Sequence, residues 1–174
     1  MRPILWSAGR LFFRHSMKTQ NSPFKKRKRV AGAERSQIHY AASEQDADML
    51  YLSGMFVPDP FWALIHQGQT IGVFNRLEYS RAVAEGGFDE VLSYESLVQA
   101  VKAKRRGSDA GVSARDVGIE LLTRHDIRAV EVPAQFPASM AFAFENAGID
   151  VGVCETAFFP QRELKQEQEA DGIR

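Results

Sequence analysis

The sequence contains very little cysteine and no long apolar run. Cys154 is the single cysteine among 174 residues, so no disulfide can form within the chain and an oxidising compartment is not implied. No apolar stretch reaches the roughly 18 residues needed to cross a bilayer. We therefore expect that the chain does not associate with a membrane. With 44% hydrophobic and 25% charged residues, the composition is that of an ordinary globular domain.

Motifs that carry chemistry are equally scarce. The sequence has no P-loop, "AEGGF" (84–88) is not a G-x-G-x-x-G loop, and Ser53 does not lie in a G-x-S-x-G elbow. The four histidines are His15, His39, His66 and His125. No two of them have the i, i+4 spacing of a helical metal site, so we expect each to be a surface or turn residue. Cys154 follows an apolar run and is expected to be a buried structural thiol.

The charge is distributed unevenly along the chain. Residues 1–35 contain ten Lys or Arg and a single acid, Glu34, whereas the remainder contains 12 basic and 21 acidic residues. An acidic body does not have the basic footprint of a nucleic-acid-binding domain. Contact with nucleic acid is therefore expected only through the basic head.

Three interpretations of the basic head remain open. "KKRKR" is typical of a nuclear import signal or a phosphate-binding tail; it comprises Lys25, Lys26, Arg27, Lys28 and Arg29. Residues 1–20 have the acid-free, Arg-bearing composition of an organellar transit peptide. The third interpretation, which we adopt as the working hypothesis, is a disordered extension that precedes the folded domain.

From Ile38 onward, apolar runs alternate with helical patterns. Strands are expected at 38–42, 88–94, 128–133 and 149–155, and a β-hairpin at 61–75. Helices are expected at 43–54, 76–87, 96–107, 113–127, 136–148 and 160–174, with Ser43 and Ser113 as N-caps. This alternation predicts an α/β domain of three layers, with a mixed, mostly parallel sheet that contains an early hairpin.

Several segments resemble a known family in their order and spacing. These are "YLSGMFVPDPFWALI" (51–65), "LEYSRA" (77–82), "VPAQFPASMAFAFENAGIDV" (132–151) and "FFPQRELKQEQEADGIR" (158–174). They resemble the N-terminal domain of the creatinase, prolidase and aminopeptidase P metallopeptidases. The resemblance implies a fold with a ribonuclease H-like motif. It divides the chain into a basic extension (1–35), the domain itself (36–156) and a charged linker helix (157–174).

The resemblance also implies a role without catalysis. The chemistry of the family lies in a C-terminal domain that holds two divalent metal ions, typically manganese, through Asp, His and Glu. The chain ends at Arg174, where that domain is expected to begin. We therefore expect a truncated accessory domain of a cytoplasmic Xaa-Pro aminopeptidase or prolidase, inactive alone and without a cofactor. Its expected partners are a separate catalytic domain and, in the parent enzyme, a second copy in a dimer.

One pair of acids has the approximate spacing of the family's metal-binding aspartates. Asp48 and Asp59 are eleven residues apart. Asp48 is better interpreted as an acid in the first turn of a helix, and Asp59 as a turn residue between two prolines. No supporting His and Glu cluster accompanies them, so we predict neither metal ligands nor catalytic residues in this chain.

The turn at Met55, Phe56 and Val57 is the main candidate for function. Three apolar residues at a turn are expected where a partner covers the surface. In the related family this region faces the catalytic domain and narrows the substrate entrance, and Arg76 and Tyr79 are weaker candidates for the same interface. The alternative is that the triplet is ordinary core beneath its own hairpin. A different function also remains open, namely an independent α/β binding or scaffold domain whose basic head contacts nucleic acid or an import receptor.

Overall fold

A computed structural model describes residues 35–105, 111–154 and 158–159. The chain separates into two units, Met1–Ala33 and Glu34–Arg174, and every described residue belongs to the second. The basic run at 25–29 and the helix expected at 160–174 lie outside the described residues. No helix in the described ranges is both long and apolar enough to span a membrane.

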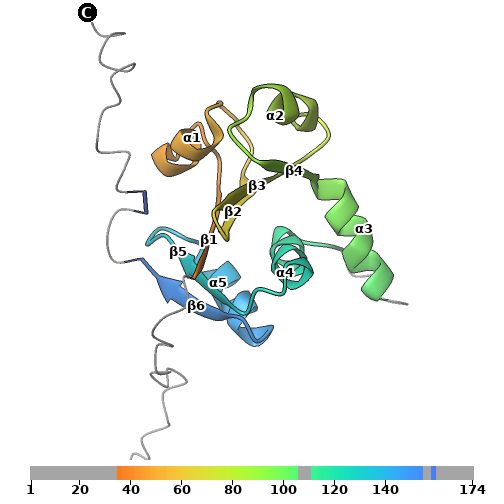
Figure 1. The fold of residues 1–174 in the computed structure, drawn as a ribbon. Coiled ribbons are helices and arrows are strands. Elements are labelled where there is room, and N and C mark those ends of the chain that lie inside the picture. Colours follow the sequence, from red (N-terminus) through yellow and green to blue (C-terminus); the bar gives the residue numbers. More distant parts are fainter. Residues whose placement is uncertain (1–34, 106–110, 155–157, 160–174) are drawn as a thin grey trace, which may run out of the picture. The chain divides into compact units, whose positions relative to one another are not determined.

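Six strands form one mixed sheet in the order β4-β3-β2-β1-β5-β6 (Figure 1). The strands are β1 (Ser36–Ala41), β2 (Phe61–His66), β3 (Gln69–Phe74), β4 (Glu90–Ser93), β5 (Ala129–Val132) and β6 (Asp150–Val153). Strand β2 pairs antiparallel with both of its neighbours, and the other three pairings are parallel. The expected α/β fold with a mixed, mostly parallel sheet is confirmed.

Within the described ranges, five helices connect the strands and cover both faces of the sheet. They are α1 (Ala47–Ser53), α2 (Tyr79–Glu85), α3 (Tyr94–Lys104), α4 (Ala114–Arg124) and α5 (Ala138–Asn146). One apolar cluster joins strand residues such as Trp62 to α3, α4 and α5. A second, smaller cluster joins the opposite face of β2 and β3 to α1 and α2 through Met49 and Ala82. The sheet is therefore the middle of three layers, as expected.

The early hairpin has the geometry that its sequence predicts. Strands β2 and β3 pair in register from Trp62 opposite Val73 to His66 opposite Gln69. The two residues between them, Gln67 and Gly68, have φ values of 52° and 77°. Two successive positive φ angles define the two-residue turn whose twist matches that of the flanking strands. Gly68 adopts such an angle without the steric penalty of a side chain.

Two helix starts were predicted from serine, and one of them is wrong. Ser113 forms a capping box at the start of α4, in which its side chain and that of Asp116 each bond to the backbone of the other. Ser43 does not cap α1, because the carboxylate of Asp46 accepts the hydrogen bond from the Met49 N–H. The hydroxyl of Ser43 is instead bonded to the chain at residues 55–57.

Two further expectations about single residues need correction. His39, expected to be a surface or turn residue, lies on β1 with 2% of its surface exposed. Its Nε2 lies 3.0 Å from Oδ2 of Asp46, and this polar partner allows an imidazole to be buried. Cys154 is half-buried rather than buried, because it lies just beyond the last residue of β6.

Candidate docking surface at the carboxyl edge of the sheet

Three loops meet at one edge of the sheet. Strands β1 and β3 end there, at Ala41 and Phe74, and the antiparallel strand β2 begins there, at Phe61. In open α/β sheets, ligands and partners are usually bound beyond the carboxyl ends of the parallel strands. The turn at 55–57, singled out from the sequence, lies between α1 and β2 at this edge.

The turn is divided between core and surface. Met55 and Val57 are 5% and 1% exposed and belong to the second apolar cluster, whereas Phe56 is 63% exposed. The two buried residues thus anchor the exposed residue between them. Met55 and Val57 therefore have the packing that the core interpretation expected. Phe56 retains the exposure that an interface requires.

Two buried serines hold the backbone on both sides of Phe56. Ser43 Oγ donates to the Met55 carbonyl at 2.7 Å and accepts from the Val57 N–H at 2.8 Å. Ser53 Oγ also donates to the Met55 carbonyl, at 3.0 Å. The hydrogen bonds link α1 and the loop after β1 to the turn, so the backbone that carries Phe56 is fixed at both ends.

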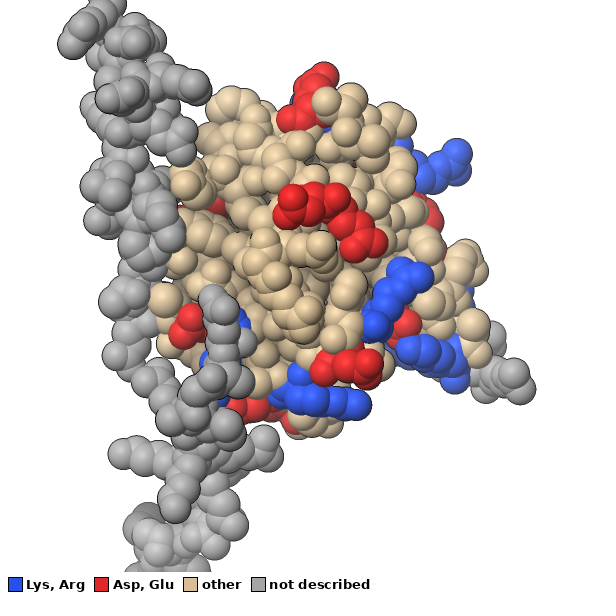
Figure 2. All heavy atoms as spheres, viewed as in Figure 1, with Lys and Arg blue, Asp and Glu red and all other residues tan. Residues whose placement is uncertain are grey.

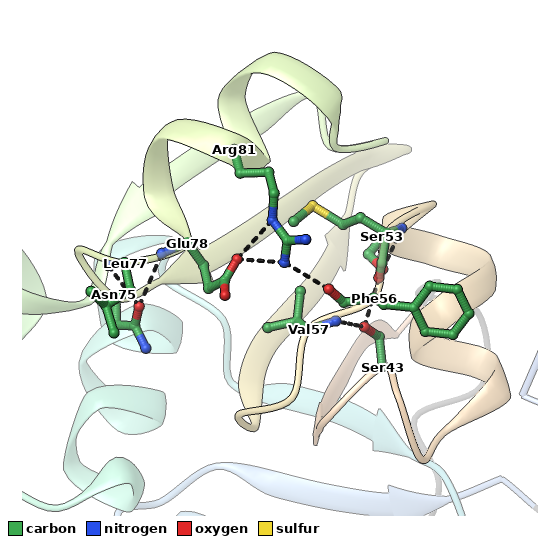
Figure 3. Close-up of polar contacts among 9 residues, drawn as sticks. Ser43, Ser53, Phe56, Val57, Asn75, Leu77, Glu78 and Arg81 are labelled. Carbon is green, nitrogen blue, oxygen red and sulfur yellow. Dashed lines mark hydrogen bonds and ion pairs between the residues drawn. The ribbon is translucent and has the colours of Figure 1, made fainter.

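An ion pair at the start of α2 fixes the carbonyl of Phe56. Arg81 donates from Nη2 to the carbonyl oxygen of Phe56 at 2.6 Å and from Nε to the Glu78 carboxylate at 2.9 Å. In Figure 3 the Phe56 ring points away from this ion pair. A partly exposed ion pair contributes little to stability, but here it orients the guanidinium toward the turn. The backbone that carries the Phe56 ring is thus held by hydrogen bonds to neighbouring elements of the domain.

The loop after β3 forms the other side of this surface. Asn75 Oδ1 accepts hydrogen bonds from the backbone N–H groups of Leu77 and Glu78, which makes a local Asx turn. Leu77 is 85% exposed, and Figure 3 places it across the ion pair from Phe56. We call Phe56, Leu77 and the ion pair between them the Phe56 surface.

The two weaker candidates lie on the same loop and at the start of α2. Arg76 is exposed, and its backbone N–H donates to the Glu95 carboxylate at 3.1 Å. Tyr79 is half-buried against the second apolar cluster as the first residue of α2. The structure thus brings the predicted candidates to one edge of the sheet. Sequence reasoning missed Ser43, Ser53 and Arg81, because their partners are distant in sequence or are backbone atoms.

A small cavity beside this surface offers little room for a substrate. Its volume is about 110 Å³, below the roughly 300 Å³ of common ligand sites. Tyr40, Tyr94 and Asp59 are among its lining residues. Burial raises the pKa of Tyr40, and the nearby Tyr94 and Asp59 raise it further, so this phenol stays protonated at neutral pH. The Tyr40 hydroxyl can therefore act as a hydrogen-bond donor at this cavity.

A metal centre does not fit the residues that are described. Among them, no group of three or more His, Cys, Asp and Glu could hold a metal ion. Asp48 is buried on α1, whereas Asp59 is exposed in the loop before β2. We therefore assign no metal ligands and derive no catalytic step through a metal.

One serine and histidine contact raises the question of nucleophilic catalysis. Ser36 Oγ and His66 Nδ1 lie 2.7 Å apart at the opposite edge of the sheet. Ser36 is 8% exposed, and within the described part of the chain no carboxylate is hydrogen-bonded to His66. A serine hydrolase needs an accessible nucleophile and an oriented base. The contact is thus better explained as a structural hydrogen bond that gives each of the two polar groups a partner.

Comparison of sequences identifies no relative. No family model matches the chain, and no curated protein matches it. Any relationship must therefore be sought in the fold.

Solved peptidase structures share the fold. An X-Pro aminopeptidase from Thermotoga maritima superposes with a TM-score of 0.57 at 16% identity over 79% of this chain and 35% of that chain. The prolidase from Pyrococcus furiosus gives 0.55 at 12% identity over 78% and 33%, respectively. A third is the X-prolyl aminopeptidase from Caenorhabditis elegans, described as a cytosolic enzyme with a di-nuclear active site. It gives 0.50 at 8% identity over 77% and 22%.

The chain matches only part of each of these peptidases. The chain spans about a third of the length of the first two peptidases and less of the third. The expected resemblance is confirmed at the level of fold. The fold corresponds to part of each peptidase, as expected for an N-terminal domain.

Proposed function

We propose that this chain, whose described part has the fold of a portion of prolidases and X-Pro aminopeptidases, is a non-catalytic accessory domain of such a peptidase. It docks through the Phe56 surface onto a catalytic domain and shapes the entrance through which substrate passes. The enzyme it serves is a cytoplasmic hydrolase that removes a residue preceding proline. The metal ions, which we take to be manganese, belong to the catalytic domain.

The observation that carries this proposal is the way in which Phe56 is presented. A phenylalanine that is 63% exposed can give a docking surface a large apolar contact at low cost in conformational entropy. The backbone around it is held by Ser43, Ser53 and Arg81, so the segment that carries the ring is already ordered before binding. Phenylalanine is among the aromatic residues that are enriched at interfaces.

The charge on the body also favours a protein partner. In Figure 2 acidic and basic side chains are interspersed over the face shown, with neutral areas between them. The body as a whole is acidic in sequence, which opposes binding to phosphate backbones. A second copy of the chain and a catalytic domain are the two partners that we propose for the Phe56 surface.

Sedimentation of two matched variants tests the proposal. Phe56→Ser removes the exposed ring from the carboxyl edge, and Phe142→Ser removes a ring of similar exposure, 52%, from α5 on the other face of the sheet. Phe56→Ser should weaken self-association, or association with a catalytic domain supplied as a separate chain. Phe142→Ser should leave both unchanged. Equal effects of the two variants would indicate non-specific association through exposed aromatic side chains rather than a docking surface.

A second candidate function is favoured by one feature of the sequence. The run of five cations at 25–29 is suited to an import receptor or to a phosphate backbone. In this case the domain is an independent binding or scaffold module. Binding to DNA or RNA that disappears when residues 1–35 are removed would favour this alternative.

A further inference from the structure

Two phenylalanines beyond the last strand are buried against the domain. Phe158 and Phe159 are 5% and 6% exposed. The ring of Phe158 lies 5.9 Å from that of His39 on β1, in an edge-to-face arrangement. The ring of Phe159 lies 6.0 Å from that of Tyr51 on α1, and the two phenylalanine rings lie 4.9 Å apart. Aromatic pairs at these separations attract one another beyond simple burial.

The pair lies on the face of the sheet that also carries α1 and α2. On the second face of the sheet, the described apolar cluster contains α1 and α2 but no residue of β5 or β6. His39 lies on this face, because it is in register with Ala63 of the same cluster. The aromatic pair thus covers part of the sheet at the margin of α1.

The surface that receives the pair is held in place by a polar network. His39 Nε2 lies 3.0 Å from Asp46 Oδ2, and Asp46 Oδ1 accepts from the Met49 N–H at the start of α1. Gln135, from the loop after β5, donates to the same carboxylate at 3.3 Å. Strand β1, helix α1 and the β5–α5 loop are therefore fixed relative to one another around His39.

We infer that His39 and Tyr51 form a binding site for an aromatic pair, and that its occupant is Phe158–Phe159 of this chain. The site anchors the chain after β6 at a fixed point on the second face of the sheet. A cavity of about 650 Å³, which Gln37, Ile65 and Glu131 also line, borders both phenylalanines. The two rings are nonetheless almost fully buried, so most of their surface is in contact with protein.

The consequence for the chain beyond Phe159 rests on the proposed function. If a catalytic domain follows or docks, an anchored exit point restricts where it can lie relative to the Phe56 surface. The binding of the aromatic pair itself does not depend on that function.

Two truncations that differ by two residues test the anchor. A chain of residues 1–159 should have the same thermal midpoint as residues 1–174, whereas a chain of residues 1–157 should melt about 5 °C or more lower. A synthetic peptide of residues 155–165, "ETAFFPQRELK", should bind the 1–157 chain saturably and restore the midpoint. The same peptide with Phe158→Ala and Phe159→Ala should do neither. Equal midpoints for the two truncations, with no peptide binding, would overturn the inference.

A readout in the full chain covers the case in which the 1–157 chain does not fold. The ring of Phe158 should shift the NMR signals of the His39 imidazole through its ring current. Phe158→Leu should move these signals toward those of an unstacked histidine, whereas Leu77→Ala on the Phe56 surface should leave them unchanged. Unmoved His39 signals in Phe158→Leu would refute the anchor. Neither experiment measures docking of a catalytic domain or peptidase activity. The anchor can therefore fail while the proposed function stands, and the proposed function can fail while the anchor stands.

Discussion

Replacement of Ser43 by aspartate distinguishes two roles for this residue. At a helix N-cap, Asp and Ser are nearly equivalent, so the sequence interpretation of Ser43 predicts almost no change in stability. In the structure, Ser43 is 1% exposed, donates to the Met55 carbonyl and accepts from the Val57 N–H. An ionised aspartate can accept from Val57 but cannot donate, and its charge would lie buried beside the Met55 carbonyl oxygen.

The magnitude follows from these contacts. Ser43→Ala leaves the Val57 N–H without its partner, whereas the Met55 carbonyl keeps its bond from Ser53. One buried donor left unsatisfied costs about 1–3 kcal/mol of unfolding free energy. Ser43→Asp adds an unpaired buried charge, for which about 3 kcal/mol or more is expected. Urea denaturation of the wild type and both variants measures these differences. An aspartate variant as stable as the wild type would show that the bonds of Ser43 to the turn are not those described.

Three further predictions concern the turn, the polar network and catalysis. About a third of the Phe56 side chain is buried, so Phe56→Ser should cost at most about 1–2 kcal/mol, whereas Val57→Ser, in the core, should cost about 3 kcal/mol or more. Urea melts that give equal losses would show Phe56 to be core. Burial works to raise the pKa of Asp46, but the hydrogen bond from Met49 and the interactions with His39 and Gln135 outweigh it and hold the pKa below its ordinary value. The contribution of this carboxylate to stability is therefore complete above its unfolded pKa of about 4 and is lost as the pH falls through the lower folded value. Between pH 5 and pH 2, the free energy of unfolding of Asp46→Asn should thus fall less than that of the wild type, as measured by denaturation curves at each pH. An equal fall in both proteins would contradict this. The purified chain should not hydrolyse X-Pro dipeptides with or without added manganese, and manganese-dependent turnover abolished by Asp48→Ala or Asp59→Ala would reveal a metal site in this chain.

The order of helices and strands was predictable because its signals are local. The hairpin at 61–75 is fixed by two apolar runs around a turn with Gly68, and α4 by a serine three residues before an acid. Each of these patterns involves residues that are close in sequence. The fold class follows from their alternation, since parallel strands need the crossover helices that separate them.

The roles of individual side chains were less predictable, because they depend on distant partners. Ser43 precedes a helical pattern and has the composition of a cap, but its bonds are made to residues 12 and 14 positions away. The burial of His39 depends on Asp46 and on Phe158, which follows it by more than 100 residues. Nothing in the local sequence indicates such a contact.

The division of the turn at 55–57 between core and surface was not predictable from the sequence. All three residues are apolar, so composition alone does not say which of them is exposed. Which side faces the core is decided by the packing of Met55 and Val57 under α1 and α2, and that packing is tertiary. The sequence thus indicates a candidate surface but not that Phe56 alone supplies its ring.

The affinity of this chain for a catalytic domain tests the central proposal most directly. The domain to use is a peptidase catalytic domain that carries the Asp, His and Glu metal ligands, supplied as a separate chain. Titration calorimetry of the wild type, Phe56→Ser and Phe142→Ser compares their dissociation constants. A ring at the centre of an interface contributes more than about 1.4 kcal/mol, so Phe56→Ser should weaken binding at least tenfold and Phe142→Ser should not. Binding of equal strength by all three proteins would contradict docking through Phe56.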